Sequence, residues 1–408
     1  MDRYLIIADD FTGANDTGVQ LKRRGIDTKV VFSSKLINTG LSSFVIDTES
    51  RGLSGEEAYS KVKDILSGID FSEFKYVIKK VDSTLRGNIA EEIKAVDDLY
   101  QSELIIFAPA FPDLKRTTVD GVHMLDNVPI TKTEMAKDPI KPVKEDNIAA
   151  ILREVYREEV VHIPLDRVRS GNIVLSEARV YTFDASTNMD IRNIIKVGLN
   201  TGKRILWVGT AGLADNLLEI QNKTAPVLSV VGSLSNVTRE QVKYAEQNGM
   251  ALVKIPVYNV IEGRASAELY SKEAVDSLMQ GKDTMVLSSA SYASEEYIKA
   301  DEAGERKGMS KEEISRFTQN LISSISKKVL ENAQISGVFL TGGDTARGFF
   351  EQVGALGSSI VGEIAIGVPL MKLVGGPFEG LKVVTKAGAF GNKDIIVYAA
   401  RKLKEVIE

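Results

Sequence analysis

The chain has 408 residues, of which 43% are hydrophobic and 26% charged, and it carries a formal net charge of −5. This length predicts two or more domains, because one hydrophobic core rarely serves so many residues, and the composition is that of a globular protein. The small negative charge offers no broad basic field, which argues against a nucleic acid as the main partner.

Cysteine and histidine are the scarce residue types. Cysteine is absent, so disulfides, thiolate metal sites and cysteine nucleophiles are excluded. His123 and His162 are the only histidines, which rules out a three-histidine metal site. His162 lies in a strand-like apolar run, where we expect a structural role. Chemistry must therefore depend mainly on carboxylates, hydroxyls, cations and backbone N–H groups.

The first ten residues, MDRYLIIADD, contain too short an apolar run for a signal peptide. No segment of the sequence approaches the length of a membrane span. We therefore expect a cytoplasmic protein with no membrane partner.

An apolar run, a polar or glycine-containing break and a helical pattern follow one another repeatedly, at residues 4–25, 76–96, 205–220, 228–247 and 337–354. This alternation predicts an α/β fold, with two α/β domains of largely parallel sheets and ligand sites at the carboxyl ends of the strands. Two residue pairs have the spacing of capping boxes and are expected to begin helices, Asn88 with Glu91 and Thr238 with Gln241.

The first predicted strand ends in Asp9 and Asp10, followed by Phe11, Thr12 and Gly13. Successive side chains of a strand point to opposite faces, so we expect one aspartate to face a ligand and the other to cap the next helix. The alternative is that both only begin the helix, where carboxylates are favoured. Two adjacent acids after a buried run are costly, which favours ligand contact by at least one of them.

A second cluster follows the strand predicted at the start of residues 76–96, in KKVDSTLRGN. It contains Lys79, Lys80, Asp82, Ser83 and Arg86. The planar fork of Arg86 could bind a carboxylate through two hydrogen bonds. A surface ion pair with a nearby acid is the alternative for this arginine.

Five of the ten prolines lie between Pro109 and Pro142, which predicts an ordered but irregular excursion. Long excursions in compact domains are often functional. Lys115 and Arg116 add cations to this segment, and two threonine hydroxyls follow them. The first half of the chain thus offers cations for an anionic group and acids and hydroxyls for a polyol, as a small sugar acid requires.

We place the domain boundary near residues 221–227, between a helical pattern and a new strand. Residues 289–313 are rich in charged and small residues. We expect them to form a solvated connection or a helix start rather than a binding segment.

Glycines gather at three strand ends in the second half, in VVGSLSNVT, LTGGDTA and TKAGAFGNKD, the last beside Lys386. One such glycine pair indicates a tight turn more readily than a binding site. Three in one domain favour a polyanion site, because glycine lets backbone N–H groups approach phosphates at a helix start. The sequence contains no Walker A motif and no G-x-G-x-x-G after a strand.

Taken in order, IADDFTGANDT, KKVDSTLRGN, APAFP…RTTVDG, VVGSLS, TGGDTA, GVPLMKLVGG and VVTKAGAFGNKD resemble the four-carbon acid sugar kinase family over nearly the whole chain. The resemblance implies a sugar-acid-binding domain over residues 1–222 and a nucleotide-binding domain over residues 226–408, with ligand sites at strand ends and in the interdomain cleft. It also implies ATP-dependent phosphorylation of the terminal 4-hydroxyl of D-threonate, D-erythronate or 3-oxo-tetronate.

The resemblance also implies site residues. ATP is expected to contact Ser233, Gly388 and the loop Gly342–Thr345, which includes Gly343 and Asp344. The sugar acid is expected to contact Asp10, Asp82, Ser83 and Arg86. We extend these sets to neighbours in the same motifs, Gly232 and Ser235 for ATP and Asp9, Thr12, Lys80 and Arg116 for the sugar acid.

Magnesium is expected to accompany ATP, with Asp344 either a direct or water-mediated ligand or a residue that orients the loop. The catalytic base is not identified. Where the family pattern usually has a glycine before the arginine of the PAFP segment, this chain has Lys115 before Arg116. The backbone shape and substrate preference of that loop are therefore open questions.

Two other functions remain as alternatives. A non-catalytic two-domain sugar-acid sensor would explain the cations of the first half but leaves the glycine-rich loops without a role. An aldolase or dehydratase would need a Schiff-base lysine or a defined metal site, and neither is evident. The expected partners are a small sugar acid and ATP, and the sequence leaves a homo-oligomer as an option.

Overall fold

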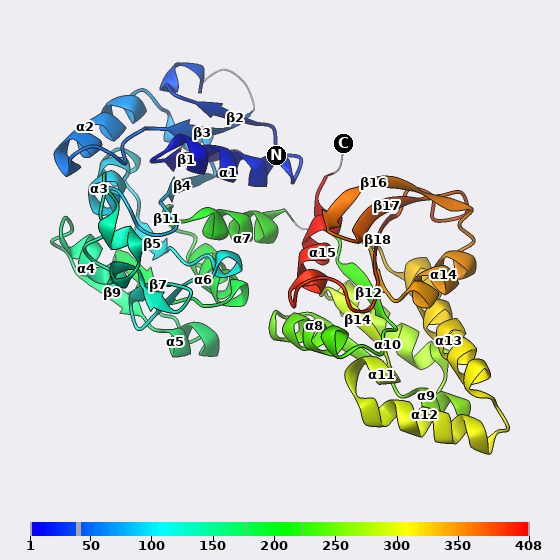
Figure 1. Cartoon of the computed structure of the whole chain (residues 1–408). Helices are drawn as coiled ribbons and strands as arrows, with labels where there is room; N and C mark the ends of the chain where they lie inside the picture. Colours follow the sequence, from blue (N-terminus) through cyan, green and yellow to red (C-terminus); the bar gives the residue numbers. More distant parts are fainter. Residues whose placement is uncertain (1, 38–41, 177, 223, 407–408) are drawn as a thin grey trace. The chain divides into compact units, whose positions relative to one another are not determined.

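The computed structural model of the protein describes residues 2–37, 42–176, 178–222 and 224–406. The chain forms two compact units (Figure 1). The first comprises the described residues before Thr224 together with Val406, whose amide donates to the Arg23 carbonyl across 2.7 Å. The second runs from Thr224 to Glu405. The last two residues of the expected C-terminal domain, 407–408, lie outside the described residues.

An eight-stranded sheet forms the centre of the first unit, in the order β2-β3-β1-β4-β11-β5-β10-β9, with every neighbouring pair parallel. Its strands are β1 (Tyr4–Ala8), β2 (Thr28–Val31), β3 (Ser43–Asp47), β4 (Tyr76–Lys80), β5 (Leu104–Ala108), β9 (Val160–Ile163), β10 (Val180–Phe183) and β11 (Ile205–Gly209). Its helices are α1 (Phe11–Lys22), α2 (Gly55–Leu66), α3 (Ile89–Tyr100), α4 (Ile148–Arg153), α5 (Leu165–Ser170), α6 (Asn188–Asn200) and α7 (Ala211–Gln221).

Both faces of this sheet are buried, as parallel sheets require. Along β1, Leu5 and Ile7 belong to one apolar cluster and Ile6 to the other. Helix α1 packs into the cluster of Ile6 and helix α3 into the cluster of Leu5. The helices that leave the adjacent strands β1 and β4 therefore cover opposite faces. This arrangement makes the ends of β1 and β4 the switch point of the sheet, where ligands bind in folds of this kind.

The proline-rich excursion is more regular than expected. Over residues 116–129 it forms an antiparallel sheet of β6 (Arg116–Val119), β7 (Val122–Leu125) and β8 (Val128–Pro129). Two-residue turns join these strands, Asp120-Gly121 with φ of 53° and 78° and Asp126-Asn127 with φ of 51° and 64°. Turns with two positive φ angles match the twist of the strands that they connect. The prediction of an irregular segment was therefore wrong for these residues.

A seven-stranded sheet forms the second unit, in the order β13-β14-β12-β15-β18-β17-β16. The first five are parallel, and β17 and β16 are antiparallel at one edge. The strands are β12 (Val227–Val231), β13 (Ala251–Ile255), β14 (Thr284–Ser288), β15 (Gly337–Thr341), β16 (Gly357–Ala365), β17 (Val368–Val374) and β18 (Lys382–Lys386). The helices are α8 (Asn236–Gln247), α9 (Val257–Ile261), α10 (Ala267–Met279), α11 (Ser289–Tyr292), α12 (Ser294–Arg306), α13 (Lys311–Asn332), α14 (Gly343–Gln352) and α15 (Ile395–Lys404).

Two α/β domains with mostly parallel sheets are thus confirmed. In the second unit, α8 leaves β12 and packs with α15, whereas α14 leaves the adjacent β15 and packs with α13. As with β1 and β4, the ends of β12 and β15 form a switch point. Among the described residues, no helix is both long enough and apolar enough to cross a membrane.

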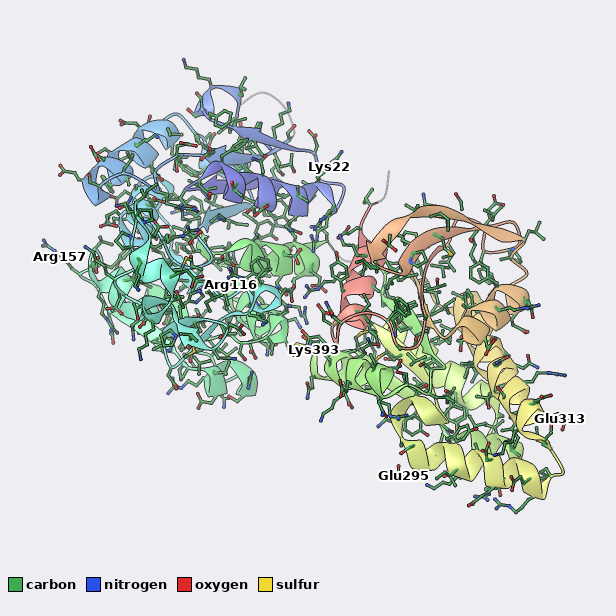
Figure 2. The ribbon with its side chains drawn as sticks, viewed as in Figure 1. Lys22, Arg116, Arg157, Glu295, Glu313 and Lys393 are labelled. Atoms are coloured by element: carbon green, nitrogen blue, oxygen red, sulfur yellow. The ribbon has the colours of Figure 1, made fainter. Side chains whose placement is uncertain are left out.

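Residues 289–313 are mostly helical, since they form α11, α12 and the start of α13, so the helix-start alternative is the observed one. Glu295 and Glu313 mark the first turns of the two longer helices (Figure 2). Neither expected capping box exists. Asn88 precedes α3 without a capping hydrogen bond from its side chain, and Thr238 and Gln241 lie inside α8, which begins after Ser235.

Candidate functional site

The acids at the strand ends of the first unit converge on an arginine that the sequence analysis did not single out. Arg51, in the segment after β3, donates through Nε to Asp9 Oδ2 and through Nη2 to Asp10 Oδ1, both at 2.6 Å. Its Nη2 also lies 3.4 Å from Asp82 Oδ1, after β4. The ends of β1, β3 and β4 therefore meet in one charged cluster.

The two adjacent aspartates differ in their surroundings, and one of them caps the next helix, as expected. Asp10 is the N-cap of α1, where its Oδ1 accepts from the Gly13 amide at 3.1 Å. Asp9 is 2% exposed, and its Oδ1 has no hydrogen-bond partner among the described residues. Thr12 is exposed in the first turn of the helix. Asp9 therefore presents an unused, buried acceptor beside the capped helix.

Lys80, at the end of β4, is a second cation close to that acceptor. Its Nζ lies 3.9 Å from Asp9 Oδ1 and 3.6 Å from Asp10 Oδ1, beyond hydrogen-bond distance, although the side chain is only 8% exposed. A Cβ added to Gly13 would lie 2.0 Å from this Nζ, so glycine is needed to make room for it. The Lys80 ammonium and the free Asp9 oxygen are therefore a donor and an acceptor available for hydrogen bonds to a small ligand.

Arg86 does not have a free fork in this structure. Its Nε and Nη2 donate to the two oxygens of Asp82, each at 3.0 Å, and its Nη1 donates to Asp138 at 3.3 Å. The ion-pair alternative for Arg86 is therefore the observed one. Burial raises the pKa of Asp82, but hydrogen bonds from Arg86 and the charge of Arg51 outweigh it and hold this pKa well below its usual range. Asp82 therefore stays ionised.

A separate buried ion pair lies next to the cluster. Lys79 Nζ lies 2.7 Å from Glu92 Oε2 of α3, and Ser50 donates to Glu92 Oε1 at 2.9 Å. Asp47, at the end of β3, is 2% exposed with one oxygen unpaired among the described residues, and burial raises its pKa. Of these residues the sequence analysis noted only Lys79.

The small sheet β6-β7-β8 is tied to the segment after β4. The buried His123 donates from Nε2 to the Ser83 carbonyl at 3.0 Å, so its Nδ1 accepts from the Thr118 hydroxyl at 3.0 Å. Burial lowers the pKa of His123 to about 4. Lys141 adds a bond to the Asn88 side chain at 2.8 Å. Through the side chains of His123 and Lys141, these contacts hold the excursion against the segment that follows β4.

The lysine that replaces the usual glycine keeps a glycine-like backbone. Lys115 has φ of 59° and ψ of 30°, in the left-handed region that glycine adopts most easily. Its exposed side chain pairs with Asp126 at 3.1 Å. Arg116, labelled in Figure 2, begins β6 with a buried Nε that has no hydrogen-bond partner among the described residues. Lys115 thus has a backbone conformation that glycine would also adopt, and the Nε of Arg116 is an unused donor among the described residues.

A pocket of about 300 Å³ lies at the strand ends of the second unit. Six of the expected residues line it, Gly232, Ser233, Gly342, Gly343, Asp344 and Thr345. The opposite wall comes from α12 and α13 and includes Ala300, Ile314 and Ile322. Residues 289–313, in which we had expected a solvated connection or a helix start rather than a binding segment, therefore contribute to the pocket wall.

The glycines of this pocket differ in backbone conformation and in the space around them. Gly342 has φ of 105° and precedes α14, which has no side-chain N-cap. A Cβ added to Gly232 would lie 2.0 Å from Thr345 Oγ1, whereas one added to Gly343 would meet nothing within 4 Å. The first turn of α14 thus presents uncapped N–H groups and the positive end of the helix dipole to open space.

The remaining two expected residues lie beside the pocket. Ser235 is the N-cap of α8 and accepts from the Val237 amide at 3.1 Å. A Cβ added to Gly388 would lie 2.6 Å from Ser233 Oγ, so the loop after β18 abuts the pocket wall. Within the described part of the chain, no group of three or more His, Cys, Asp or Glu side chains could hold a metal ion. Asp301 and Asp344 do line the pocket, and carboxylate oxygens suit an Mg²⁺ that arrives with phosphates.

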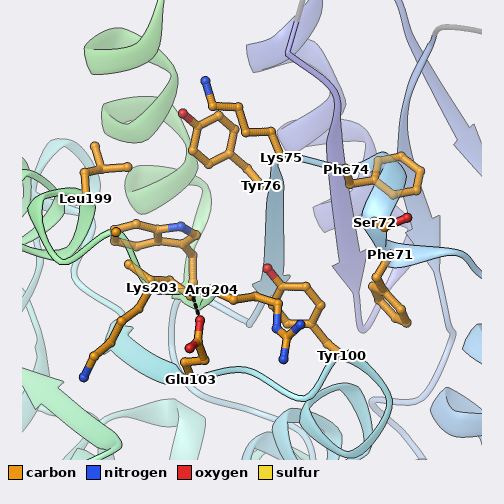
Figure 3. Close-up of a pocket in the computed structure, with 13 residues that line it drawn as sticks. Phe71, Ser72, Phe74, Lys75, Tyr76, Tyr100, Glu103, Leu199, Lys203 and Arg204 are labelled. Carbon is orange, nitrogen blue, oxygen red and sulfur yellow. Dashed lines mark hydrogen bonds between the residues drawn. The ribbon is translucent and has the colours of Figure 1, made fainter.

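A second cavity, of about 510 Å³, opens at the amino end of the first sheet (Figure 3). Aromatic rings line it, among them Tyr76 at the start of β4. Two of its cations have protein partners, because Lys75 pairs with Asp2 at 2.7 Å and Arg204 donates to the Gln101 carbonyl at 2.9 Å. It lies away from the carboxyl ends of the strands, where ligands of parallel sheets bind, and is not the candidate site.

Two family models match the chain, one in each unit. The first is described as a sugar-binding N-terminal domain and matches residues 4–217. The second is described as a nucleotide-binding C-terminal domain and matches residues 228–396. The strand-end cluster of acids lies within the first match, and the glycine-lined pocket lies within the second.

Curated relatives align over nearly the whole chain. A D-threonate kinase of Salmonella typhimurium is 33% identical over 99% of this chain and 99% of its own length. A D-erythronate kinase of Heliobacterium modesticaldum is 29% identical over 97% of this chain and 95% of its own. A solved structure from Bordetella bronchiseptica, described as a domain of unknown function with bound citrate in a domain-swapped dimer, is 27% identical, covers 98% of both chains and has a TM-score of 0.65.

Proposed function

The chain belongs to the four-carbon acid sugar kinase family, and we propose that it uses ATP to phosphorylate the terminal 4-hydroxyl of D-threonate, D-erythronate or 3-oxo-tetronate. The observation that carries this proposal is the division of chemistry between the units. A buried cluster of acids and cations lies in the unit that matches a sugar-binding model, and a glycine-lined pocket at a helix start lies in the unit that matches a nucleotide-binding model. We accordingly assign residues 1–222 to the sugar acid and residues 226–408 to the nucleotide.

In the first unit, the free oxygen of Asp9 accepts a hydrogen bond from a substrate hydroxyl, because it is buried and has no donor among the described residues. The Lys80 ammonium binds the anionic group of the substrate, since among the described residues of the cluster it is the cation that makes no hydrogen bond to protein. Arg86 holds Asp82 in its ionised state, and binding of a substrate carboxylate by Arg86 requires exchange from Asp82.

In the second unit, the ATP phosphates bind the N–H groups at the start of α14, beside Gly232 and Ser233. The adenine lies against the apolar wall of Ala300, Ile314 and Ile322. Asp344 is the carboxylate that would hold Mg²⁺, which when bound neutralises the phosphate charges. Phosphoryl transfer needs chiefly positioning and charge neutralisation, which suits a chain without cysteine.

Calorimetry tests this proposal against a sugar-acid sensor. A kinase binds both a four-carbon sugar acid and magnesium–ATP, whereas a sensor binds the sugar acid alone. We expect two separate binding isotherms with the folded protein. Binding of the sugar acid without any binding of magnesium–ATP contradicts the kinase proposal. Light scattering of the same sample tests whether the protein is a homo-oligomer.

A further inference from the structure

The loop after β18, residues 387–392, turns its carbonyl groups toward the interior of the second unit. Lys386 Nζ donates to the carbonyls of Ala387 at 3.2 Å and Gly388 at 2.9 Å. The Thr238 hydroxyl, from α8, donates to the same Gly388 carbonyl at 2.9 Å. Gln241 Nε2, one helical turn further, donates to the carbonyls of Phe390, Gly391 and Asn392 at 3.0, 3.0 and 3.1 Å.

The three donors are buried and are committed to this loop. Thr238 and Gln241 are 0% exposed and Lys386 is 2% exposed. The Gln241 amide oxygen has no partner among the described residues, so its NH₂ group is the part of the side chain that binds. A buried ammonium costs free energy unless it is compensated. Burial lowers the pKa of Lys386 to about 8, and two carbonyls bind the charged form.

Inward carbonyls leave the loop amides facing outward, because the C=O and N–H of a trans peptide point in opposite directions. In the described chain, the amides of Gly388, Ala389, Gly391 and Asn392 donate to no other protein group. The loop is largely exposed, and Lys393 follows it at the surface (Figure 2). Its Gly388 abuts Ser233 of the glycine-lined pocket. Backbone amides gathered in this way bind anions.

We propose that Thr238, Gln241 and Lys386 are positioning residues that hold the 387–392 loop with its amides turned toward the nucleotide phosphates. The inference rests on the proposed function and deepens it, because it identifies a support for phosphate binding that contacts no substrate. If these residues act through the loop, their loss weakens the binding of phosphates and leaves the binding of the nucleoside unchanged. A general effect on the fold would weaken both.

The test is a comparison of nucleotides that differ only in phosphate content. Thr238→Val removes the hydroxyl with little change of shape, and Thr238→Ser retains it. Gln241→Leu removes the amide, and Gln247→Leu, on an exposed residue of the same helix, is its control. For each variant, calorimetry measures the Kd of ATP, ADP and adenosine, and a melting curve verifies the fold.

We expect Thr238→Val and Gln241→Leu to weaken ATP and ADP binding by about tenfold or more, with adenosine binding unchanged. Thr238→Ser and Gln247→Leu should bind all three ligands like the parent. Unchanged ATP binding in Thr238→Val, or equal losses for ATP and adenosine, overturns the inference while the proposed function stands. If Gln241→Leu does not fold, the Thr238 pair decides. Failure of the parent to bind ATP overturns both the proposed function and this inference.

Discussion

Arg51 Nε donates to Asp9 Oδ2 across 2.6 Å, and this bond joins the segment after β3 to the end of β1. The same guanidinium binds Asp10 at 2.6 Å and lies 3.4 Å from Asp82. Arg51 therefore binds three carboxylates at the switch point of the first sheet, and without it Asp9 would keep only the more distant Lys80 charge.

Arg51→Met should both destabilise the protein and abolish sugar-acid binding. Asp9, which is 2% exposed, loses its paired cation, and breaking a buried pair of this kind costs roughly 3 kcal/mol in the free energy of unfolding. Denaturant unfolding measures the stability, and calorimetry measures the two ligands. Arg157→Met is the control, because Arg157 is an exposed arginine of the same unit. Magnesium–ATP binding should survive, and sugar-acid binding at parental affinity contradicts the assignment.

Arg86→Ala should lower kcat/KM for the sugar acid, because the fork that binds Asp82 is lost. The loss should correspond to about 2–4 kcal/mol of transition-state stabilisation, while the KM for ATP changes little. Arg86→Lys should not rescue activity, since an ammonium cannot replace the fork. The double variant with Asp82→Asn separates two mechanisms. If Arg86 acts through Asp82, the double variant is no worse than the single ones. Additive losses indicate that Arg86 binds the substrate directly.

Regular alternation in the sequence was enough to predict the two α/β units and the strand ends at which charged residues gather. Arg51 was missed although its segment runs from strand β3 through a polar break to helix α2, because the position of β3 beside β1, which brings Arg51 to the acids, is set by long-range pairing. Its one signal was a polar run, DTESRG, after an apolar one.

Two other predictions failed for different reasons. The spacing of Thr238 and Gln241 fits a capping box, but both side chains bind a loop about 150 residues away, which no local pattern can reveal. The dipeptide Asp120-Gly121 between apolar residues was a hairpin signal, and the prolines around it led us to expect irregular backbone instead. The three glycine-rich segments were correctly predicted to follow strands, because each comes after an apolar run, and the polyanion site that we expected there stays a prediction.

Gly343→Val should abolish magnesium–ATP binding with almost no change in the melting temperature. An added Cβ meets no atom within 4 Å, and the positive φ belongs to Gly342 rather than Gly343, so the larger side chain fits without strain and fills the pocket instead. Sugar-acid binding should be retained. Calorimetry with both ligands gives the answer, and loss of the sugar acid with retention of ATP shows that the two units have been assigned in reverse.

His123→Gln should flatten the dependence of stability on pH below neutrality. In the parent, burial lowers the His123 pKa to about 4 from 6.5, so between these values the unfolded chain binds a proton that the folded protein does not. Stability therefore falls as pH drops from 6.5 toward 4, by up to about 3 kcal/mol from this group. Urea unfolding at several pH values measures the difference between the two proteins. If the free energy of unfolding of the two proteins changes with pH in parallel, the prediction is contradicted.

The central claim is tested most directly by phosphorylation itself. Purified protein is incubated with ATP, magnesium and, in parallel, D-threonate, D-erythronate and their 3-oxo counterparts, and ³¹P NMR locates the phosphate on the product. We predict ADP formation that depends on a four-carbon acid, with the phosphate on the terminal 4-hydroxyl, and the ratio of kcat/KM values identifies the preferred acid. A folded protein that phosphorylates none of these acids contradicts the account.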